Sequence, residues 1–172
     1  MSWFTRKGRS EDPARGNARP GPGSSDPVEA DGPVEVPLRP VIERVGVEEQ
    51  ERIARGRAGL AAAGVDSADL DALGAAFDAA LSGWLDASTG QRGDERELVE
   101  QFAIGIGDHL ASHTDLRWAR VTDAFGTDLA VAGGRDEFVV VPGNLVAARW
   151  MNADRGWVPG VVTHLVRVRA SR

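Results

Sequence analysis

The spacing of apolar side chains predicts three helices between residues 47 and 113. The clearest repeat has an apolar residue every three or four positions: Leu70, Leu73, Phe77, Leu81 and Trp84. This is the repeat of one helix face, and Asp66 or Ser67 can cap the helix, which ends near Asp86. A second stripe of Leu98, Phe102, Ile106 and Leu110 predicts a helix over 94–113. A weaker pattern predicts a helix over 47–63, stopped by Gly64.

After residue 113 the apolar pattern changes to the two-residue period of strands. Three short runs alternate or are rich in β-branched residues: Arg117–Thr122, Leu129–Ala132 and Glu137–Val141. Turn residues at 123–126 and 133–136 join them, which predicts a three-stranded antiparallel meander. A helix follows over 144–153 with Asn144 as a possible cap, and a last helix over 159–169. In Leu165–Arg169 apolar residues alternate with Arg, so a strand is the alternative for that segment.

These elements predict an α+β domain in which N-terminal helices pack on a small three-stranded antiparallel meander with C-terminal helices. Seven of the nine prolines lie within residues 13–40, among Gly, Ser and alternating charges. Such a segment buries too little apolar surface to offset its conformational entropy. We therefore expect a disordered tail over residues 1–42 and a single domain over 43–172.

Composition narrows the classes of function. The chain has no Cys, which excludes disulfides and thiolate chemistry, and no apolar run long enough for a transmembrane segment. The net charge is −6, and residues 66–113 alone carry ten acidic side chains against two Arg. This charge argues against nucleic-acid binding. We expect a cytoplasmic protein with a possible protein partner and an unknown oligomeric state.

The segment 116–131 has the highest density of specific residue types, and we expect it to meet the third helix. Gly105 and Gly107 each cost a helix interior about 1 kcal/mol relative to Ala. Close approach of the sheet near Trp118 accounts for that cost. The predicted junction contains Gly105, His109, Trp118, Asp123, Phe125 and Asp128.

Two constellations in this region have the residue types of a catalytic or metal site. His109 and His113 are four residues apart on a helix and can present two imidazoles to one metal, with His164, Asp108, Asp123 or Asp128 as a third ligand. No recognised metal-binding pattern joins them, and a packed histidine pair is the alternative. Asp123 and Asp128 can divide acid and base roles, or simply stabilise a turn. We predict no catalytic residues, no metal and no cofactor.

Aromatic residues are the remaining candidates for binding. Trp118 is expected in the core, whereas Trp150 and Trp157 fit either the core or an interface. The low-specificity candidates for binding are therefore His109, Trp118, Asp123, Phe125, Asp128, Trp150 and Trp157. Separately, residues 3–9 combine Trp3 and Phe4 with basic side chains, which can support weak contact with a membrane surface.

Part of this pattern resembles a known family. The helix Phe102–Leu110, the segment Arg117–Asp128 and the strand Phe138–Val141 followed by Pro142 are similar to the bacterial domain-of-unknown-function family 3806. The resemblance covers about residues 98–168. It implies a small α+β domain, and it implies no activity and no catalytic residues.

The favoured hypothesis is a non-catalytic binding or adaptor domain with a protein partner. Its basis is the acidic helical face, the aromatic residues and the absence of a recognised catalytic motif in the sequence. The first alternative is a small-ligand-binding protein or enzyme that uses His109 with Asp123 or Asp128. The second is weak membrane-surface association through residues 3–9.

Overall fold

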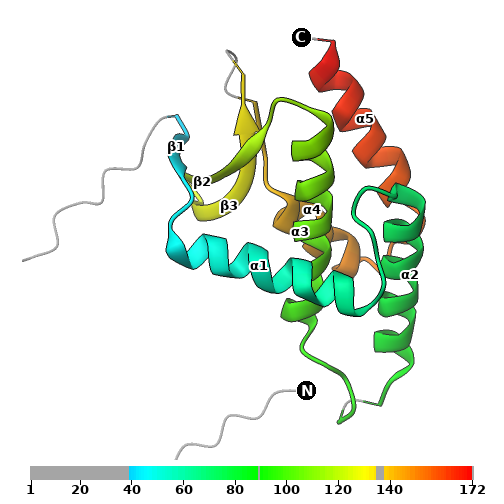
Figure 1. The fold of residues 1–172 in the computed structure, drawn as a ribbon. Helices are drawn as coiled ribbons and strands as arrows, with labels where there is room; N and C mark the ends of the chain where they lie inside the picture. The colour runs from blue at the N-terminus through cyan, green and yellow to red at the C-terminus, as the bar shows by residue number, and fades with distance from the viewer. Residues whose placement is uncertain (1–38, 89, 135–137, 172) are drawn as a thin grey trace, which may run out of the picture. The chain divides into compact units, whose positions relative to one another are not determined.

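The observed helices and strands follow the predicted periodicities closely. The computed structural model describes residues 39–88, 90–134 and 138–171, which all belong to the unit Glu35–Arg172. The tail predicted over 1–42 lies outside these residues, except for its last four. The helices are α1 Val47–Ala62, α2 Leu70–Asp86, α3 Glu95–His113, α4 Pro142–Met151 and α5 Val158–Ala170, and the strands are β1 Val41–Arg44, β2 Arg117–Asp123, β3 Gly126–Gly133 and β4 Phe138–Val140 (Figure 1).

The α+β class is confirmed, but the sheet has four strands and not the predicted three. Its order is β1-β2-β3-β4, and every neighbouring pair is antiparallel. The additional strand is β1, whose Val41 pairs with Thr122. An ion pair of 2.7 Å between Arg120 and Glu43 joins the same two strands. Four residues with two charges among them are too short a run to reveal a period, so the pattern missed β1.

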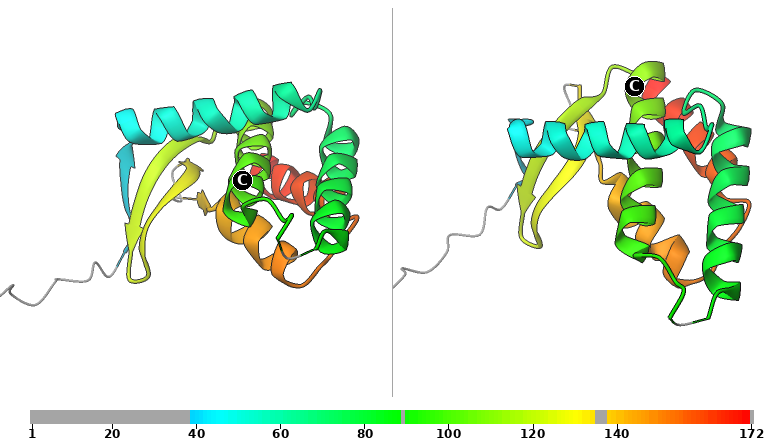
Figure 2. Two further views of the ribbon diagram at one scale, coloured as in Figure 1. Left: turned by 90° about the horizontal axis from the view of Figure 1, so that it is seen from below. Right: turned by 60° about the horizontal axis from the view of Figure 1, so that its bottom comes forward.

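Helix α3 is the central element of the fold. It contacts α1, α2, α4 and α5 and also the strands β2 and β3. Both views in Figure 2 place the sheet on one side of α3 and α2 on the other, with α1 crossing from the sheet toward α2. Among the described helices, none has both the length and the hydrophobicity needed to cross a bilayer.

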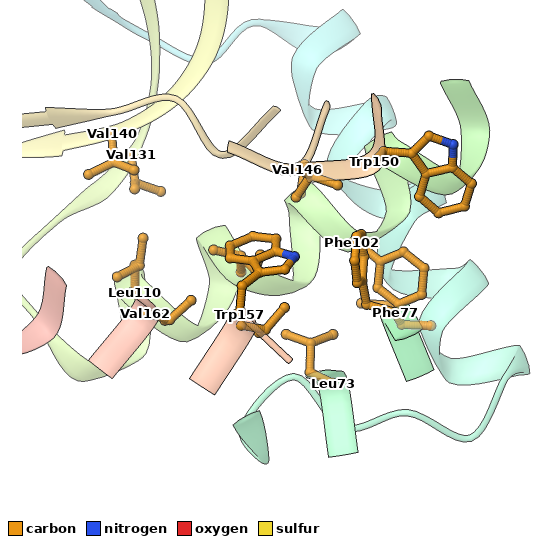
Figure 3. Close-up of a cluster of buried hydrophobic side chains, with 14 of the residues drawn as sticks. Leu73, Phe77, Phe102, Leu110, Val131, Val140, Val146, Trp150, Trp157 and Val162 are labelled. Carbon is orange, nitrogen blue, oxygen red and sulfur yellow. The ribbon is translucent and has the colours of Figure 1, made fainter. Parts of the chain in front are cut away.

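The main core lies between α3 and the helices around it, and Phe77 is at its centre. Phe77 makes edge-on contacts with Phe102, Trp150 and Trp157 at ring distances of 5.5, 5.8 and 5.6 Å (Figure 3). The Phe77 side chain is fully buried. Edge-on aromatic pairs add to the stabilisation from buried area. This cluster fixes α4 and the start of α5 against α2 and α3.

Two local predictions at helix starts need correction. Asp69 caps α2, accepting hydrogen bonds from the backbone N–H groups of Asp71 and Ala72, whereas Asp66 and Ser67 lie before the cap. Helix α4 begins at Pro142 and not at Asn144, because proline suits a first turn where its missing N–H is not needed. The last helix, predicted over 159–169, is confirmed as α5, and it includes Leu165–Arg169, for which a strand had been the alternative.

The predicted close approach of helix and sheet occurs at Gly107. A Cβ at this position would overlap the indole ring of Trp118 on β2. The indole Nε1 donates a hydrogen bond of 2.9 Å to Asp108, and Arg57 of α1 binds both oxygens of that carboxylate at 2.7 and 2.6 Å. Gly105, predicted at the same junction, faces Leu60 and Leu73 instead. Gly107 therefore lets β2 lie close to α3, and Gly105 lets side chains of α1 and α2 lie close to it.

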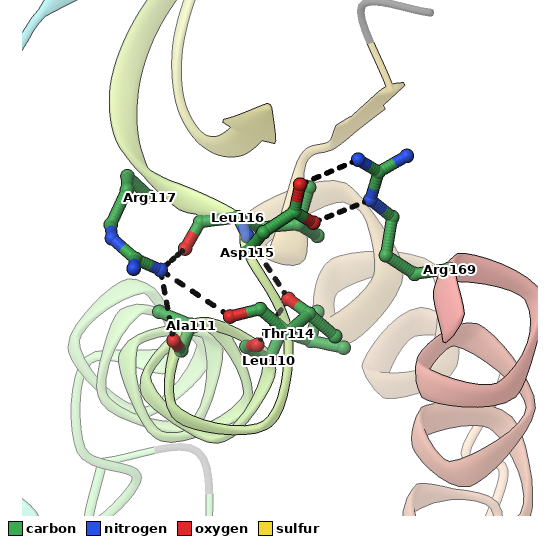
Figure 4. A network of polar contacts seen from close by, with 7 residues as sticks. All are labelled: Leu110, Ala111, Thr114, Asp115, Leu116, Arg117 and Arg169. Atoms are coloured by element: carbon green, nitrogen blue, oxygen red, sulfur yellow. Dashed lines mark hydrogen bonds and ion pairs between the residues drawn. The ribbon is translucent and has the colours of Figure 1, made fainter. Parts of the chain in front are cut away.

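The connection from α3 to β2 is held by polar contacts with α5. Arg169 binds the carboxylate of Asp115 through two nitrogens at 2.6 and 2.7 Å, and its side chain is only 9 % exposed (Figure 4). The Thr114 hydroxyl donates to the Leu110 carbonyl and accepts the Leu116 N–H. These contacts set the direction in which β2 leaves α3.

We predict that Gly107→Ala destabilises the domain although alanine is the better helix former. Overlap with Trp118 costs up to about 3 kcal/mol, against a gain in helix propensity of about 1 kcal/mol. The matched control is Gly83→Ala in α2, where a Cβ meets nothing within 4 Å. Urea unfolding should show a lower free energy of unfolding for Gly107→Ala and an unchanged or higher one for Gly83→Ala. Equal effects at both sites would contradict the close contact.

Candidate functional site

The structure separates the seven predicted binding residues into four places. Trp118, Asp128 and Trp150 line one cavity. Asp123 and Phe125 lie at the turn between β2 and β3, where Asp123 accepts the Phe125 N–H at 2.7 Å. Phe125 is 97 % exposed, so its predicted place at the helix–sheet junction is wrong. The remaining two, His109 and Trp157, are buried elsewhere.

The cavity lies between α3, α4 and the sheet, and it has a volume of about 300 Å³. Helix α3 presents one face to it through residues spaced by three and four positions, including Val99, Ala103 and Ile104. Helix α4 contributes Pro142, Gly143, Ala147, Trp150 and Met151, and the sheet contributes Trp118, Asp128 and Leu129. The small side chains of Ala103 and Ala147 leave the space that a larger apolar residue would fill.

Five charged residues also line the cavity: Arg52, Glu95, Arg96, Glu100 and Asp128. Arg52 and Glu100 pair with each other at 3.0 Å. Within the described residues, the side chains of Glu95, Arg96 and Asp128 make no hydrogen bond or ion pair. Two unpaired carboxylates and one unpaired guanidinium leave a formal charge of −1 on these groups. The cavity thus combines an apolar interior with charges that are free to meet a second molecule.

Two tryptophans give the cavity fixed walls. The indole of Trp118 is held by Asp108 and by its contact with Gly107, as described above. Trp150 is only 5 % exposed and packs edge-on against Phe77 and Trp84. Its Nε1 has no acceptor among the described residues, so packing alone orients this ring. Trp150 is therefore both a core residue and a cavity residue, whereas Trp157 belongs to the core.

His109 lies on a different side of α3, away from the sheet. Its Nδ1 donates a hydrogen bond of 2.9 Å to the Ser67 carbonyl ahead of α2, and its ring stacks on His113 at 4.0 Å. His109 is buried, whereas His113 is exposed. No group of three His, Cys, Asp or Glu side chains suited to a metal ion occurs in the described part of the chain. Asp123 and Asp128 share no contact with His109.

Burial changes the acid–base behaviour of His109. Loss of solvation lowers its pKa, the Ser67 hydrogen bond raises it, and the neighbouring His113 lowers it, with a net lowering. Burial is the largest of these effects, because a charged imidazole loses more hydration than a neutral one. The environment of His109 therefore favours its neutral form, and the hydrogen bond to the Ser67 carbonyl places the proton on Nδ1.

Most cavity residues were not predicted as site residues. Glu95, Val99 and Ala103 follow one another at intervals of four residues along α3, so helical periodicity alone could have grouped them. Their meeting with Ala147 of α4 and Leu129 of β3 depends on tertiary packing. No local pattern in the sequence contains that information.

The chain is similar to one known family over the region that contains the cavity. The model of the family described as a domain of unknown function, DUF3806, matches residues 79–159, which confirms the resemblance over residues 98–159. The match runs from α2 to the start of α5 and contains every residue lining the cavity except Arg52. Comparisons with curated proteins and with solved structures gave no match.

We predict that His109 makes the domain less stable in mildly acidic solution. Because its pKa is lower in the folded than in the unfolded state, its contribution is fully present above the unfolded value of about 6.5 and is lost as pH falls below it. The free energy of unfolding, measured from about pH 7.5 to about pH 5.5, should fall more steeply for the wild type than for His109→Asn. If the free energies of unfolding of the two proteins changed in parallel with pH, His109 would not be the cause of the loss of stability in acid.

Proposed function

We propose that this protein is a non-catalytic binding domain, which holds an apolar group of a protein partner in the cavity between α3 and α4. The observation that carries the proposal is the cavity itself, which combines fixed aromatic walls with unpaired charged side chains. Binding sites typically pair an apolar interior with a few polar groups that set orientation. A cavity of about 300 Å³ accommodates a side chain or a short apolar segment.

The charge of the domain supports a protein partner with basic residues. Three carboxylates and two guanidinium groups line the cavity, and one pair of them is already neutralised by mutual contact. The chain as a whole has a net charge of −6. Complementary charge steers association and suppresses wrong partners.

The enzymatic alternative lacks a shared site for its residues. His109 contacts Ser67 and His113, while Asp128 lines the cavity with Trp118. A general base must lie within hydrogen-bond reach of the group that it serves. The alternative of membrane contact through residues 3–9 lies outside the described residues.

We predict that the cavity binds neutral models of apolar side chains, such as N-acetyl-tryptophanamide and N-acetyl-leucinamide. Titration followed by amide chemical shifts in NMR should move the signals of Ala103, Ile104 and Leu129 together. Ala147→Phe should abolish these shifts by filling the cavity. The matched control is Ala148→Phe, the next residue of α4, which is exposed and does not line the cavity. Shifts that persist in Ala147→Phe, or that lie elsewhere, would contradict the proposed function.

A further inference from the structure

Beside the cavity, part of one edge of β3 has no strand paired to it among the described residues. Strand β3 runs from Gly126 to Gly133 and pairs with β2 along nearly its whole length. On its other side, β4 pairs only with Val131, Ala132 and Gly133. Residues 126–130 therefore have no strand on that side within the described part of the chain. We call this stretch the open edge of β3.

The open edge and the cavity are one continuous surface. Asp128 and Leu129, in the middle of the open edge, both line the cavity. Alternate residues of such an edge present unpaired backbone N–H and C=O groups, which are a template for a further strand. Proteins that bind extended peptides use this arrangement, with backbone hydrogen bonds giving affinity and adjacent pockets giving specificity.

The two sides of the open edge differ in chemistry. Leu129 is paired with Arg120 and shares the helix-facing side of the sheet with Trp118, and it packs with Ile53 and Ile104. Asp128 points to the opposite side, because successive side chains of a strand alternate between faces. A strand added here would place every second residue toward the apolar cavity and the residues between them on the side of Asp128.

We infer that the partner of the proposed binding domain docks as an extended strand on the open edge of β3, with an apolar residue directed into the cavity and flanked by basic residues. The basic residues follow from charge complementarity, since they would lie on the side of Asp128, whose carboxylate has no partner in the described residues. The inference rests on the proposed function, and it specifies the backbone geometry and the chemistry of the partner.

The test uses the unmodified protein and synthetic peptides. The probe is a seven-residue peptide in which lysine alternates with apolar residues. The central residue is leucine and the other two apolar residues are valine. Both ends are capped to remove terminal charges. Two further peptides carry N-methyl groups on alternate amides, one set on the odd and one on the even positions. N-methylation removes the hydrogen bond of a strand edge and leaves the side chains in place, so only the set facing β3 should matter.

The expected result is that one N-methylated peptide binds at least about tenfold more weakly, because each set removes several backbone hydrogen bonds, while the other binds like the parent. Amide exchange in residues 126–130 should slow when the parent peptide is bound. A peptide with glutamate in place of lysine should bind more weakly than the parent, and Asp128→Asn should narrow that difference.

Different failures have different meanings. Equal binding of both N-methylated peptides, or no preference for the parent over a scrambled isomer, overturns strand docking. If strand docking is overturned but peptide binding is still lost in Ala147→Phe and kept in Ala148→Phe, the proposal that the cavity binds an apolar group still stands. If no peptide and no apolar probe responds to Ala147→Phe, the proposed function itself is wrong. Tighter binding of the glutamate peptide overturns the basic partner.

Discussion

The contact of the Trp118 indole with α3 is the interaction on which the position of the sheet depends. Gly107 lets the ring lie on the helix, and Asp108 accepts its N–H at 2.9 Å. Arg57 of α1 binds the same carboxylate, whose side chain is only 16 % exposed. One carboxylate thus links α1, α3 and β2, and hydrogen bonds to charged groups stabilise by about 1.5–3 kcal/mol.

The cavity is a consequence of this arrangement. Trp118 holds β2 against α3, and Leu129 on the neighbouring β3 is thereby placed opposite Ile104. Helix α4 closes the space because the aromatic contacts of Phe77 fix Trp150. The apolar walls are therefore built by the core, while the side chains of Glu95, Arg96 and Asp128 make no hydrogen bond or ion pair with the described residues. The proposed site is therefore pre-formed by the fold.

Local periodicity predicted most of the fold, because each long helix has its own apolar stripe and each strand of the meander has its own alternation or apolar run. Short elements and helix ends could not be predicted in this way. Strand β1 has only four residues. At the start of α2, Asp66, Ser67 and Asp69 are all residue types that cap helices well. Glycines at 105 and 107 indicated close packing, but only the three-dimensional fold assigns Gly107 to Trp118 and Gly105 to Leu60. The cavity depends on contacts between α3, α4 and β3, so the sequence indicated Trp118, Asp128 and Trp150 without showing that they meet.

A double-mutant cycle between Asp108 and Trp118 tests the central claim most directly. Asp108→Ala removes the acceptor, Trp118→Phe removes the indole N–H while keeping an aromatic ring, and the free energy of unfolding is measured for both single variants and the double variant. The structure predicts a coupling energy of about 1 kcal/mol or more, as for residues in one hydrogen-bond network. Additivity within about 0.3 kcal/mol would show that Trp118 and Asp108 do not act together in holding the sheet to α3.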